Sequence, residues 1–282
     1  MRRLVGGREL GYDDHGSGPA VVLLHPFPFA RDIWSGGNGQ DDVVVALARR
    51  FRVIVVDARG FGESALRATH PTPGASKPYA ITDLADDLAA LLDALAIPRA
   101  ALVGMSMGGY TALAFAALHP ARLSALVLAD TRAAADTPET RAKREEALAT
   151  IHGQGPTAYL DGSLARLLSP DAPPAVRALA RARAEARADS LVAGIEALRD
   201  RPDRTAELAA ITCPALVVCG ALDQVTPPAE MRRMSAAIGD RGSAAGAARY
   251  VELVGAGHIA HLEAGEAFTT AVGSFLADAL AA

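Results

Sequence analysis

The segment AALVGMSMGGYTALAFAALHP, residues 100–120, joins a short apolar run, a glycine-rich turn and a run with the composition of a helix. The turn contains the pattern Gly-x-Ser-x-Gly, with Ser106 between Gly104 and Gly108. A serine on a tight strand-to-helix turn needs neighbours without a β-carbon, because strand and helix must close around it. The segment therefore predicts a nucleophilic serine at the carboxyl end of a buried strand. The alternative is a glycine-serine turn without a chemical role.

Short β-branched runs alternate with Ala/Leu-rich segments along the rest of the chain. The runs lie at 20–24, 52–56, 100–104, 124–129, 214–218 and 250–254. Strands that are apolar throughout and separated by helices are typical of a parallel sheet covered on both faces. LVGGRELGYDD, residues 4–14, has the pattern of a hairpin, so we expect an antiparallel first edge. The sequence predicts an α/β fold with a mostly parallel, twisted sheet flanked by helices on both faces.

Residues 81–97 predict one of the covering helices. Thr82 can cap its amino end. Its buried face is expected to carry the leucines at 84, 88, 91, 92 and 95. The aspartates at 86, 87 and 93 are then left facing water.

The interval 131–213 breaks the alternation, because its Ala/Arg/Glu/Leu segments show helical patterns separated by glycine and proline and no convincing strand. A connection of that length is a linker or a lid, and its half-apolar helical character favours an α-helical cap across one edge of the sheet. We expect the first part of the core in residues 1–130, a cap in 131–205 and the second part of the core in 206–282. Within the cap, ALARARAEARAD at 178–189 is interpreted as a solvated helix face in preference to an anion-binding surface.

Composition restricts the class of partner. The 282 residues include 28 basic and 32 acidic side chains, a net charge of −4, which provides no long-range attraction for nucleic acid or an anionic membrane. No segment approaches the apolar length needed to span a bilayer, and no apolar run follows the two arginines near the start. We expect a cytoplasmic protein that acts on a small molecule. The composition leaves its oligomeric state open.

The cysteines are interpreted as core thiols. Cys213 and Cys219 are six residues apart. If they share one strand they lie roughly 20 Å apart, at about 3.3 Å per residue, which is beyond the reach of a disulfide. A zinc pair needs closer spacing and histidine partners, so we expect no metal at these residues.

A serine nucleophile needs a base to take its proton and an acid to orient that base. His258 follows the last predicted strand on a Gly-Ala-Gly loop, at the same sheet edge as Ser106. His261 is the nearest alternative, although IAHLE reads as the start of the final helix. The sequence favours His258 as the base.

Two aspartates compete for the role of the acid. Asp223 lies three residues after the glycine that ends another strand, and Asp130 directly follows the run at 124–129. Either can also serve as a cap or turn residue. The chain order Ser106, Asp223, His258 fits the order known for this arrangement, so Asp223 is favoured and Asp130 stays open.

The stretch HPFP, which follows the run at 20–24, predicts a donor for the developing negative charge of an acyl-transfer reaction. Such an oxyanion needs two fixed N–H donors, one after the nucleophile and one on an early strand-to-helix loop. Met107 and Phe27 are the candidates, because Pro26 and Pro28 hold the Phe27 amide out of a strand ladder. The alternative is a rigid turn with Phe27 packed under the cap, and both can hold together. His25 is expected to orient this loop through hydrogen bonds.

These segments together resemble the α/β-hydrolase superfamily over nearly the whole chain. LLHPFPFARDIW is similar to the family's His-Gly-containing oxyanion loop, and VVDARGFGES to its Asp-x-Arg-Gly-x-Gly-x-Ser turn. GMSMGGYTALAFAALHP, CPALVVCGALDQVTPP and GAGHIAHLE are similar to its nucleophile, acid and histidine segments. Pro26 stands where the family usually has glycine, which affects the loop's shape and leaves the donor at Phe27. Asp57, Arg59 and Ser64 are expected to hold the turn near the site and not to react.

Length and cap position resemble the bacterial enol-lactonase and small-esterase branch. The resemblance implies a cofactor-independent serine hydrolase that cleaves a small carboxylic ester or lactone through an acyl-enzyme. Phe27, Phe29 and Trp34, with cap leucines, are predicted to line or close an apolar substrate pocket.

Other functions stay open on the same residues. Carbon–carbon bond hydrolysis and perhydrolase or cofactor-free haloperoxidase chemistry are known on such triads. Ser106 argues against dehalogenase and epoxide-hydrolase chemistry, which normally use aspartate as the nucleophile. A ligand receptor or pseudoenzyme on the hydrolase scaffold is an alternative of another class, because a fold does not fix a function.

Overall fold

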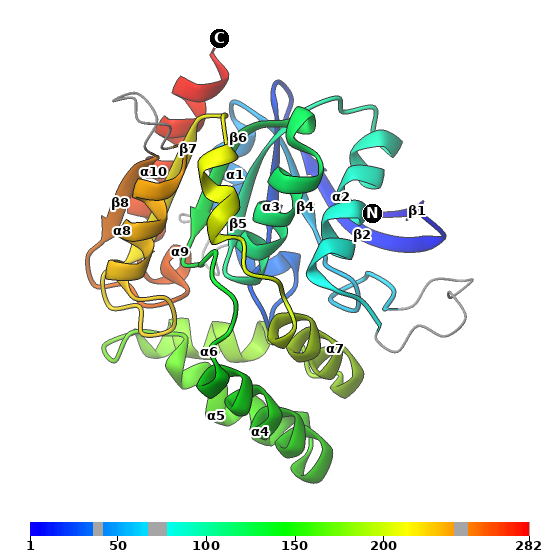
Figure 1. Cartoon of the computed structure of the whole chain (residues 1–282), viewed down its shortest axis with the longest axis vertical. Helices are drawn as coiled ribbons and strands as arrows, with labels where there is room; N and C mark the ends of the chain where they lie inside the picture. Colours follow the sequence, from blue (N-terminus) through cyan, green and yellow to red (C-terminus); the bar gives the residue numbers. More distant parts are fainter. Residues whose placement is uncertain (36–41, 67–77, 240–247, 282) are drawn as a thin grey trace.

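One mixed sheet forms the centre of the molecule (Figure 1). In residues 1–35, 42–66, 78–239 and 248–281, the part of the chain that the computed structural model describes, eight strands pair in the order β1-β2-β4-β3-β5-β6-β7-β8. The strands are β1 (Arg2–Val5), β2 (Arg8–His15), β3 (Ala20–Leu24), β4 (Arg52–Val56), β5 (Ala100–Met105), β6 (Leu123–Ala129), β7 (Ala215–Gly220) and β8 (Arg249–Leu253). β2 pairs antiparallel with β1 and with β4, and all other neighbours are parallel. The predicted mostly parallel sheet with an antiparallel first edge is confirmed.

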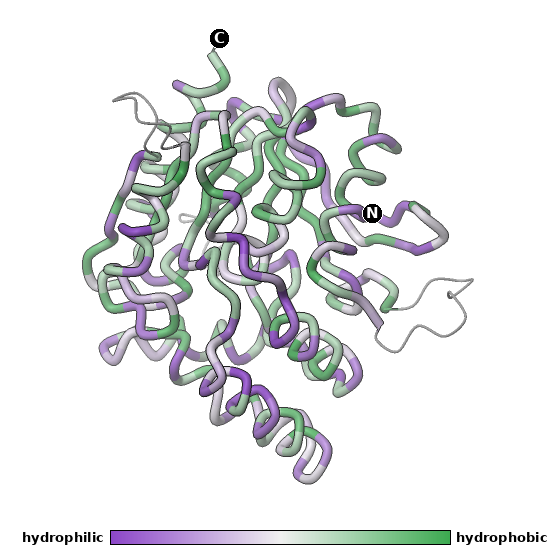
Figure 2. Tube along the Cα trace, viewed as in Figure 1, coloured by the Kyte–Doolittle hydropathy of each residue, from purple (hydrophilic) through white to green (hydrophobic). Residues whose placement is uncertain are grey.

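The six predicted core strands are all present, with ends that differ by at most two residues. β5 is buried along its whole length, as is β7. Figure 2 shows the central strands as the most hydrophobic part of the trace. Continuous apolar runs of this kind follow from a sheet that is covered on both faces.

Helices cover both faces of the sheet. They are α1 (Val43–Ala48), α2 (Ile81–Ala94), α3 (Met107–Leu118), α4 (Pro138–Gln154), α5 (Pro156–Ser163), α6 (Pro174–Arg183), α7 (Ala188–Arg199), α8 (Pro228–Ala237), α9 (Ala260–Glu263) and α10 (Gly265–Leu280), with short 3₁₀ turns η1 (Arg31–Trp34), η2 (Pro120–Arg122), η3 (Leu164–Arg166) and η4 (Thr205–Ala210). α1 packs against α10, α2 packs against α3, and α8 packs against β7 and β8. None of the helices in the described ranges combines the length and apolar character needed to cross a bilayer.

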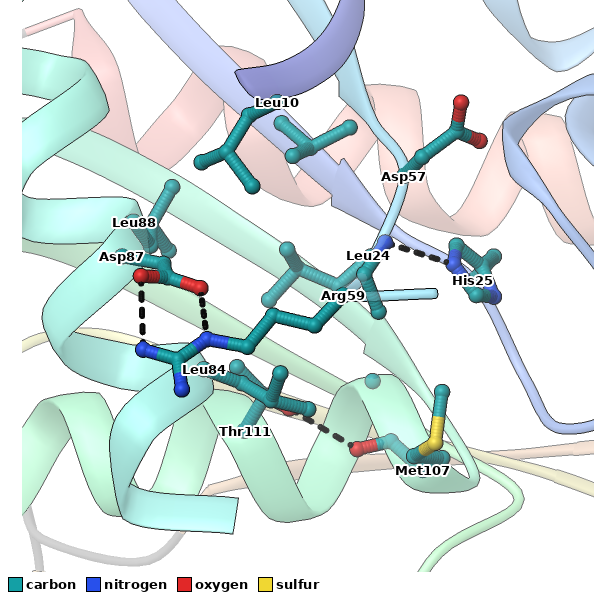
Figure 3. Close-up of a pocket in the computed structure, with 13 residues that line it drawn as sticks. Leu10, Leu24, His25, Asp57, Arg59, Leu84, Asp87, Leu88, Met107 and Thr111 are labelled. Atoms are coloured by element: carbon teal, nitrogen blue, oxygen red, sulfur yellow. Dashed lines mark hydrogen bonds and ion pairs between the residues drawn. The ribbon is translucent and has the colours of Figure 1, made fainter. Parts of the chain in front are cut away.

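Helix α2 differs in detail from its prediction. The leucines at 84, 88, 91 and 92 are buried as expected. The cap is not Thr82: the Asp83 carboxylate accepts the Ala80 N–H at 2.7 Å. Asp87 does not face water, because its Oδ1 accepts a hydrogen bond of 2.8 Å from Nη2 of Arg59 (Figure 3). A carboxylate on the polar side of a helix can thus be an ion-pair partner for a neighbouring loop.

The interval between β6 and β7 holds α4, α5, α6 and α7, which lie together at one end of the sheet (Figure 1). α4 packs against α5 and α7. Within the described residues, no strand of the sheet comes from 131–205. The helical character of the interval is as expected, and its separation as a cap of 131–205 between two parts of the core stays a prediction.

The segment 178–189 is not one solvated helix, which corrects the prediction. α6 ends at Arg183, and Ala184 forms a β-bridge with Phe29. The Glu185 N–H donates to the Pro28 carbonyl at 2.8 Å, and Nη1 of Arg183 donates to the Asp32 carbonyl at 2.5 Å. The segment therefore attaches the interval 131–205 to the HPFP loop.

The cysteines do not share a strand, so the separation calculated for a single strand does not apply. Cys219 is buried in β7, and Cys213 lies before the strand begins. Both are free thiols. Burial raises the pKa of the Cys213 thiol to about 11, and burial also raises the pKa of Cys219. Both side chains are therefore protonated and weakly reactive at neutral pH.

Candidate active site

Ser106 lies between the end of β5 and the start of α3. Its backbone has φ +50° and ψ −112°, a region that side-chain-bearing residues rarely adopt. A β-carbon on Gly104 would lie 2.3 Å from the Gly108 carbonyl oxygen, and one on Gly108 would lie 2.0 Å from the Leu24 carbonyl oxygen. Because both positions need glycine, the spacing read from the sequence is the spacing that this turn requires.

Ser106, His258 and Asp223 are joined by hydrogen bonds. His258 Nε2 lies 2.8 Å from Ser106 Oγ, and Nδ1 lies 2.9 Å from Asp223 Oδ2. With Asp223 ionised, Nδ1 carries the ring proton and Nε2 accepts from the serine hydroxyl. His258 and Asp223 are almost fully buried, and Ser106 is 8% exposed. The arrangement allows His258 to remove the proton of the Ser106 hydroxyl.

Asp223 is held by its own turn. Its Oδ1 accepts the N–H groups of Val225 and Thr226 at 2.7 and 3.0 Å, and Oδ2 accepts the Thr226 hydroxyl at 2.5 Å. Burial raises the pKa of Asp223, but the neighbouring His258 and these hydrogen bonds outweigh burial and leave the pKa lowered. Thr226 was not predicted, although an aspartate followed three residues later by threonine is a recognisable turn signal.

Asp130, the competing acid, does not contact His258. Its backbone has φ +43°, and Oδ1 accepts the Gly220 N–H at 2.8 Å. Complete burial and the nearby Asp223 raise the pKa of Asp130 well above its usual range. A carboxyl group whose ionised form is disfavoured by burial is a poorer partner for orienting a histidine than one whose ionised form is stabilised. The structure therefore brings Asp223 to His258 and leaves Asp130 bound to β7.

His261 lies away from Ser106. Its Nε2 donates to the Ile33 carbonyl at 2.9 Å, and its ring packs against the Trp34 ring in a tilted arrangement with 4.7 Å between centroids. Burial lowers the pKa of His261 to about 4, so the ring is neutral. This histidine ties η1 to the start of α9, and His258 is the one that the structure places beside Ser106.

The HPFP loop leaves one backbone donor free. Within the described residues, neither the Phe27 N–H nor the Met107 N–H has a hydrogen-bond partner. His25 supports this loop, since its Nδ1 donates to the Pro26 carbonyl at 3.0 Å. Its Nε2 accepts the Ala58 N–H at 2.9 Å, the hydrogen bond drawn to His25 in Figure 3. Burial lowers the pKa of His25, so the ring is neutral and can both donate and accept. These contacts match the orienting role expected for His25.

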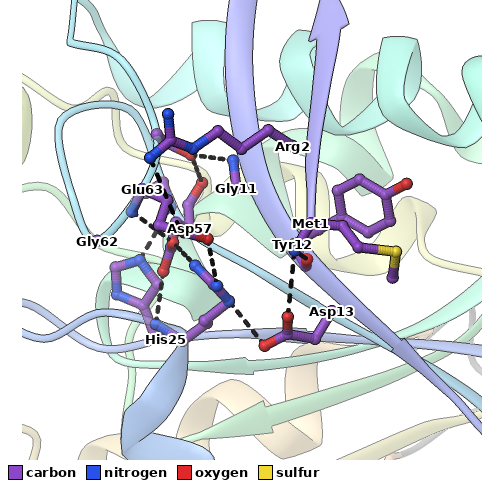
Figure 4. Close-up of polar contacts among 12 residues, drawn as sticks. Met1, Arg2, Gly11, Tyr12, Asp13, His25, Asp57, Gly62 and Glu63 are labelled. Carbon is purple, nitrogen blue, oxygen red and sulfur yellow. Dashed lines mark hydrogen bonds and ion pairs between the residues drawn. The ribbon is translucent and has the colours of Figure 1, made fainter.

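Asp57 and Ser64 hold the turn behind the site. The Asp57 carboxylate accepts the N–H groups of Arg31 and Glu63 at 2.8 and 2.9 Å and pairs with the Arg31 guanidinium (Figure 4). The Ser64 hydroxyl donates to the Asp57 carbonyl at 2.7 Å. Their side chains make no hydrogen bond to Ser106 or His258 in the described part of the chain. Arg59, through Asp87, joins the same turn to α2.

A cavity of about 550 Å³ opens beside Ser106 and His258. Phe27 lines it, and its ring lies 6.5 Å from the Tyr159 ring, centroid to centroid. Its other lining residues include Pro28, Tyr110, Leu167, Leu198 and Val225, together with a set of charged side chains from the 131–205 interval and from α8.

Phe29 and Trp34 do not line this cavity, which corrects the prediction. Both are fully buried. Phe29 lies at the β-bridge to Ala184, and Trp34 packs against His261 and Phe268. Their rings fill the core beneath the loop, where they exclude water but do not face a ligand.

Glu263 is a further residue that sequence reasoning missed. Its Oε1 accepts the Gly257 N–H at 2.9 Å, and its Oε2 accepts the Ser169 N–H at 2.8 Å. One carboxylate thus fixes the loop that carries His258 and attaches it to the 131–205 interval. A glutamate at the end of a short helix carries no sequence signal for this role.

A metal ion does not fit the one cluster of ligand-type residues that the described ranges contain. Asp130, Cys219 and Asp223 have ligand atoms within 4.8 Å of one another. Asp223 is occupied by Thr226 and His258, while the pKa values of Asp130 and Cys219 are raised. Protonated groups are poor ligands, so this donor set does not favour a cation.

Comparisons with known proteins identify the family. A sequence model described as alpha/beta hydrolase fold matches residues 19–265. The 3-oxoadipate enol-lactonase 2 of Acinetobacter baylyi is 33% identical over 227 residues, which cover 79% of this chain and 78% of that protein. Among solved structures, a malate-bound thermophilic esterase from Thermogutta terrifontis has a TM-score of 0.85 and 32% identity over 99% of this chain and 98% of that one. The enol-lactonase of Burkholderia xenovorans has a TM-score of 0.82 and 33% identity over 98% and 99%. The family predicted from the motifs is confirmed: the chain belongs to the α/β-hydrolase family.

Proposed function

We propose that the protein is a serine hydrolase that cleaves a small carboxylic ester or lactone through an acyl-enzyme. The observation that carries the proposal is the hydrogen-bonded series Asp223, His258 and Ser106, which ends at a cavity of about 550 Å³. The relatives named as esterase and enol-lactonase support this substrate class.

In the first half-reaction, Ser106 Oγ attacks the carbonyl carbon while His258 Nε2 takes the hydroxyl proton. The carbonyl oxygen becomes an oxyanion, to which the unpartnered N–H groups of Phe27 and Met107 donate. Collapse of the tetrahedral intermediate breaks the bond to the alkoxy oxygen, which receives the proton from His258. The acyl group is then an ester of Ser106.

In the second half-reaction, water attacks the acyl-enzyme, and His258 again takes the proton. The second intermediate collapses to the carboxylic acid and restores Ser106. With a lactone, the acid and the alcohol remain in one molecule, so only ring opening is seen. Asp223 keeps the ring proton on Nδ1 of His258 and stabilises the imidazolium in both halves.

The test is the hydrolysis of p-nitrophenyl acetate and p-nitrophenyl butyrate, with a δ-lactone as a third substrate. Ser106→Ala is expected to lower kcat by at least about 10³-fold, since nucleophile and base act as a unit. Ser17→Ala, at an exposed position before β3, is the matched control and should retain wild-type rates. Equal activity in Ser106→Ala would refute the nucleophile. Binding of esters without turnover by the wild type would instead favour a receptor on this scaffold.

A further inference from the structure

The cavity beside Ser106 carries an excess of positive charge. Among its lining residues are two carboxylates and four cationic side chains: Asp136, Glu230, Arg132, Lys143, Arg144 and Arg166. The whole chain has a net charge of −4, so the excess is opposite in sign to that of the protein. A cavity that differs in this way from the rest of the molecule selects for ligand charge.

Each carboxylate of the cavity already has a cationic partner. Asp136 is buried and accepts Nη1 of Arg201 at 2.5 Å and Nε of Arg144 at 3.2 Å. Arg201 does not line the cavity, so Asp136 pairs with one cation outside the cavity and with one, Arg144, that lines it. Glu230 lies 3.6 Å from Nε of Arg132. These carboxylates are therefore not available to neutralise the two cations that remain.

Lys143 and Arg166 are those two cations. Within the described part of the chain, neither side chain has an ion pair or a hydrogen bond to another residue, and both residues are exposed at the cavity. Lys143 lies on α4, and Arg166 lies on η3 directly after α5. Their charges are balanced only by solvent when the cavity is empty of ligand.

The two cations lie on faces that are turned toward the cavity. On α4 the lining residues are 140, 143, 144 and 147, and on α5 and η3 they are 159, 163, 166 and 167. Intervals of three and four residues place side chains on one face of a helix. Lys143 thus lies on the same face of α4 as Thr140, and Arg166 lies on the same face of α5 and η3 as Tyr159.

We propose that the substrate of this hydrolase carries a carboxylate besides the scissile ester or lactone, and that Lys143 and Arg166 bind it. The proposal rests on the proposed function and adds the class of substrate: a half-ester of a dicarboxylic acid or a lactone that bears an acid group. A carboxylate on the substrate would provide the negative partner that Lys143 and Arg166 lack. The other two cations of the cavity, Arg144 and Arg132, already have such partners in Asp136 and Glu230. A neutral ester of the same shape leaves Lys143 and Arg166 without a negative partner.

The test compares matched substrates. Mono-p-nitrophenyl esters of adipic, pimelic and suberic acid carry a terminal carboxylate, and the corresponding terminal carboxamides are neutral analogues of the same shape. Butyrate esters of 4-hydroxybutyrate and 4-hydroxybutyramide place the same difference on the alcohol side. In at least one series we expect kcat/KM for the carboxylate to exceed that for the amide by about tenfold or more, and the ratio to fall as salt is added.

Variants connect the preference to the two cations. In the double variant Lys143→Gln and Arg166→Gln, the carboxylate-to-amide ratio is expected to fall toward one. Arg233→Gln removes a positive charge from an exposed position of α8 that does not line the cavity, and should leave the ratio unchanged. Equal kcat/KM for carboxylate and amide in both series overturns the proposal, as does a ratio that survives the double variant.

A binding measurement separates this proposal from the proposed function. In Ser106→Ala, titration calorimetry with monomethyl adipate and methyl adipamate needs no turnover. Tighter binding of the carboxylate by about tenfold, lost in the Lys143→Gln and Arg166→Gln background, supports the proposal whatever the catalytic result. Equal binding of monomethyl adipate and methyl adipamate overturns the proposal. If the esters with a terminal carboxamide are still hydrolysed at their ester bond in a reaction that needs Ser106, the proposed function remains intact.

Discussion

Asp130 and Asp223 place carboxylate oxygens within 4.8 Å of each other, but only Asp223 contacts His258. The neighbouring buried carboxyl groups differ in their partners. Asp223 receives hydrogen bonds from Val225, Thr226 and His258 and has a lowered pKa, whereas the pKa of Asp130 is raised by burial and by Asp223. The pair can therefore carry one negative charge, located on the carboxylate that orients the histidine.

Exchanging each acid for its amide tests this division. Asp223→Asn is expected to lower kcat for a p-nitrophenyl ester by on the order of 10⁴-fold, because the amide favours the wrong tautomer of His258. Asp130→Asn should cost far less, since an amide resembles a protonated carboxyl group. Steady-state kinetics on both variants decides. A larger loss of kcat in Asp130→Asn than in Asp223→Asn would contradict the assignment of Asp223 as the acid that orients His258.

The same pair predicts how stability depends on pH. Below about pH 4, Asp130 is protonated in both the folded and the unfolded chain. As the pH rises, the unfolded chain ionises first, so Asp130 lowers the free energy of unfolding by up to about 1.4 kcal/mol per pH unit until its raised folded pKa is reached. Asp130→Asn removes this loss. Urea unfolding at several pH values should show the variant gaining on the wild type as pH rises, and parallel curves would refute a raised pKa.

Two glycines provide a matched test of the serine turn. Gly108→Ala places a β-carbon 2.0 Å from the Leu24 carbonyl oxygen, so we expect a loss of about 1–3 kcal/mol or more in the free energy of unfolding. Gly153→Ala adds the same methyl group to α4, where nothing lies within 4 Å, and should be neutral or stabilise by about 0.5–1 kcal/mol. Thermal or urea unfolding of both variants measures the difference. Similar stabilities would show that the close approach at Gly108 is not required.

Phe27 separates the contribution of a backbone amide from that of a side chain. Phe27→Ala keeps the N–H and removes the ring that lines the cavity, so KM should rise while kcat stays within about tenfold. Phe27→Pro removes the N–H and is expected to lower kcat by about 10²–10³-fold. Pro26→Gly keeps the donor and should stay within about tenfold of wild type. Circular dichroism checks the fold of each variant, and unchanged kcat in Phe27→Pro would exclude this amide as an oxyanion donor.

The parts of the fold that were predicted from the sequence are those that local sterics and burial decide. Gly104 and Gly108 are required by contacts of 2.3 and 2.0 Å, so the turn around Ser106 leaves a clear pattern in the sequence. The parallel strands leave continuous apolar runs because both of their faces are covered. His258 could be favoured over His261 because it lies on the loop that follows β8, at the sheet edge where Ser106 also lies, whereas His261 lies within α9.

Other features depend on which distant residue is in contact, and a single sequence does not contain that information. Trp34 and Phe27 are both buried aromatic residues of one loop, yet the Trp34 ring packs against His261 and only Phe27 lines the cavity. Asp87 has the position of a solvent-facing residue and pairs with Arg59. The charged residues of 178–189 indicate a solvated helix, but in the structure the Glu185 N–H donates to the Pro28 carbonyl and the segment contacts the HPFP loop.

The most direct test of Ser106 as the nucleophile is chemical trapping. A p-nitrophenyl alkylphosphonate is incubated with the folded protein, and the modified residue is mapped by mass spectrometry of the digested chain. We expect one phosphonyl group per chain, on the peptide that contains Ser106, with release of one p-nitrophenol and no modification in Ser106→Ala. A phosphonyl group on another residue, or the absence of labelling while ester hydrolysis continues, would contradict an acyl-enzyme at Ser106.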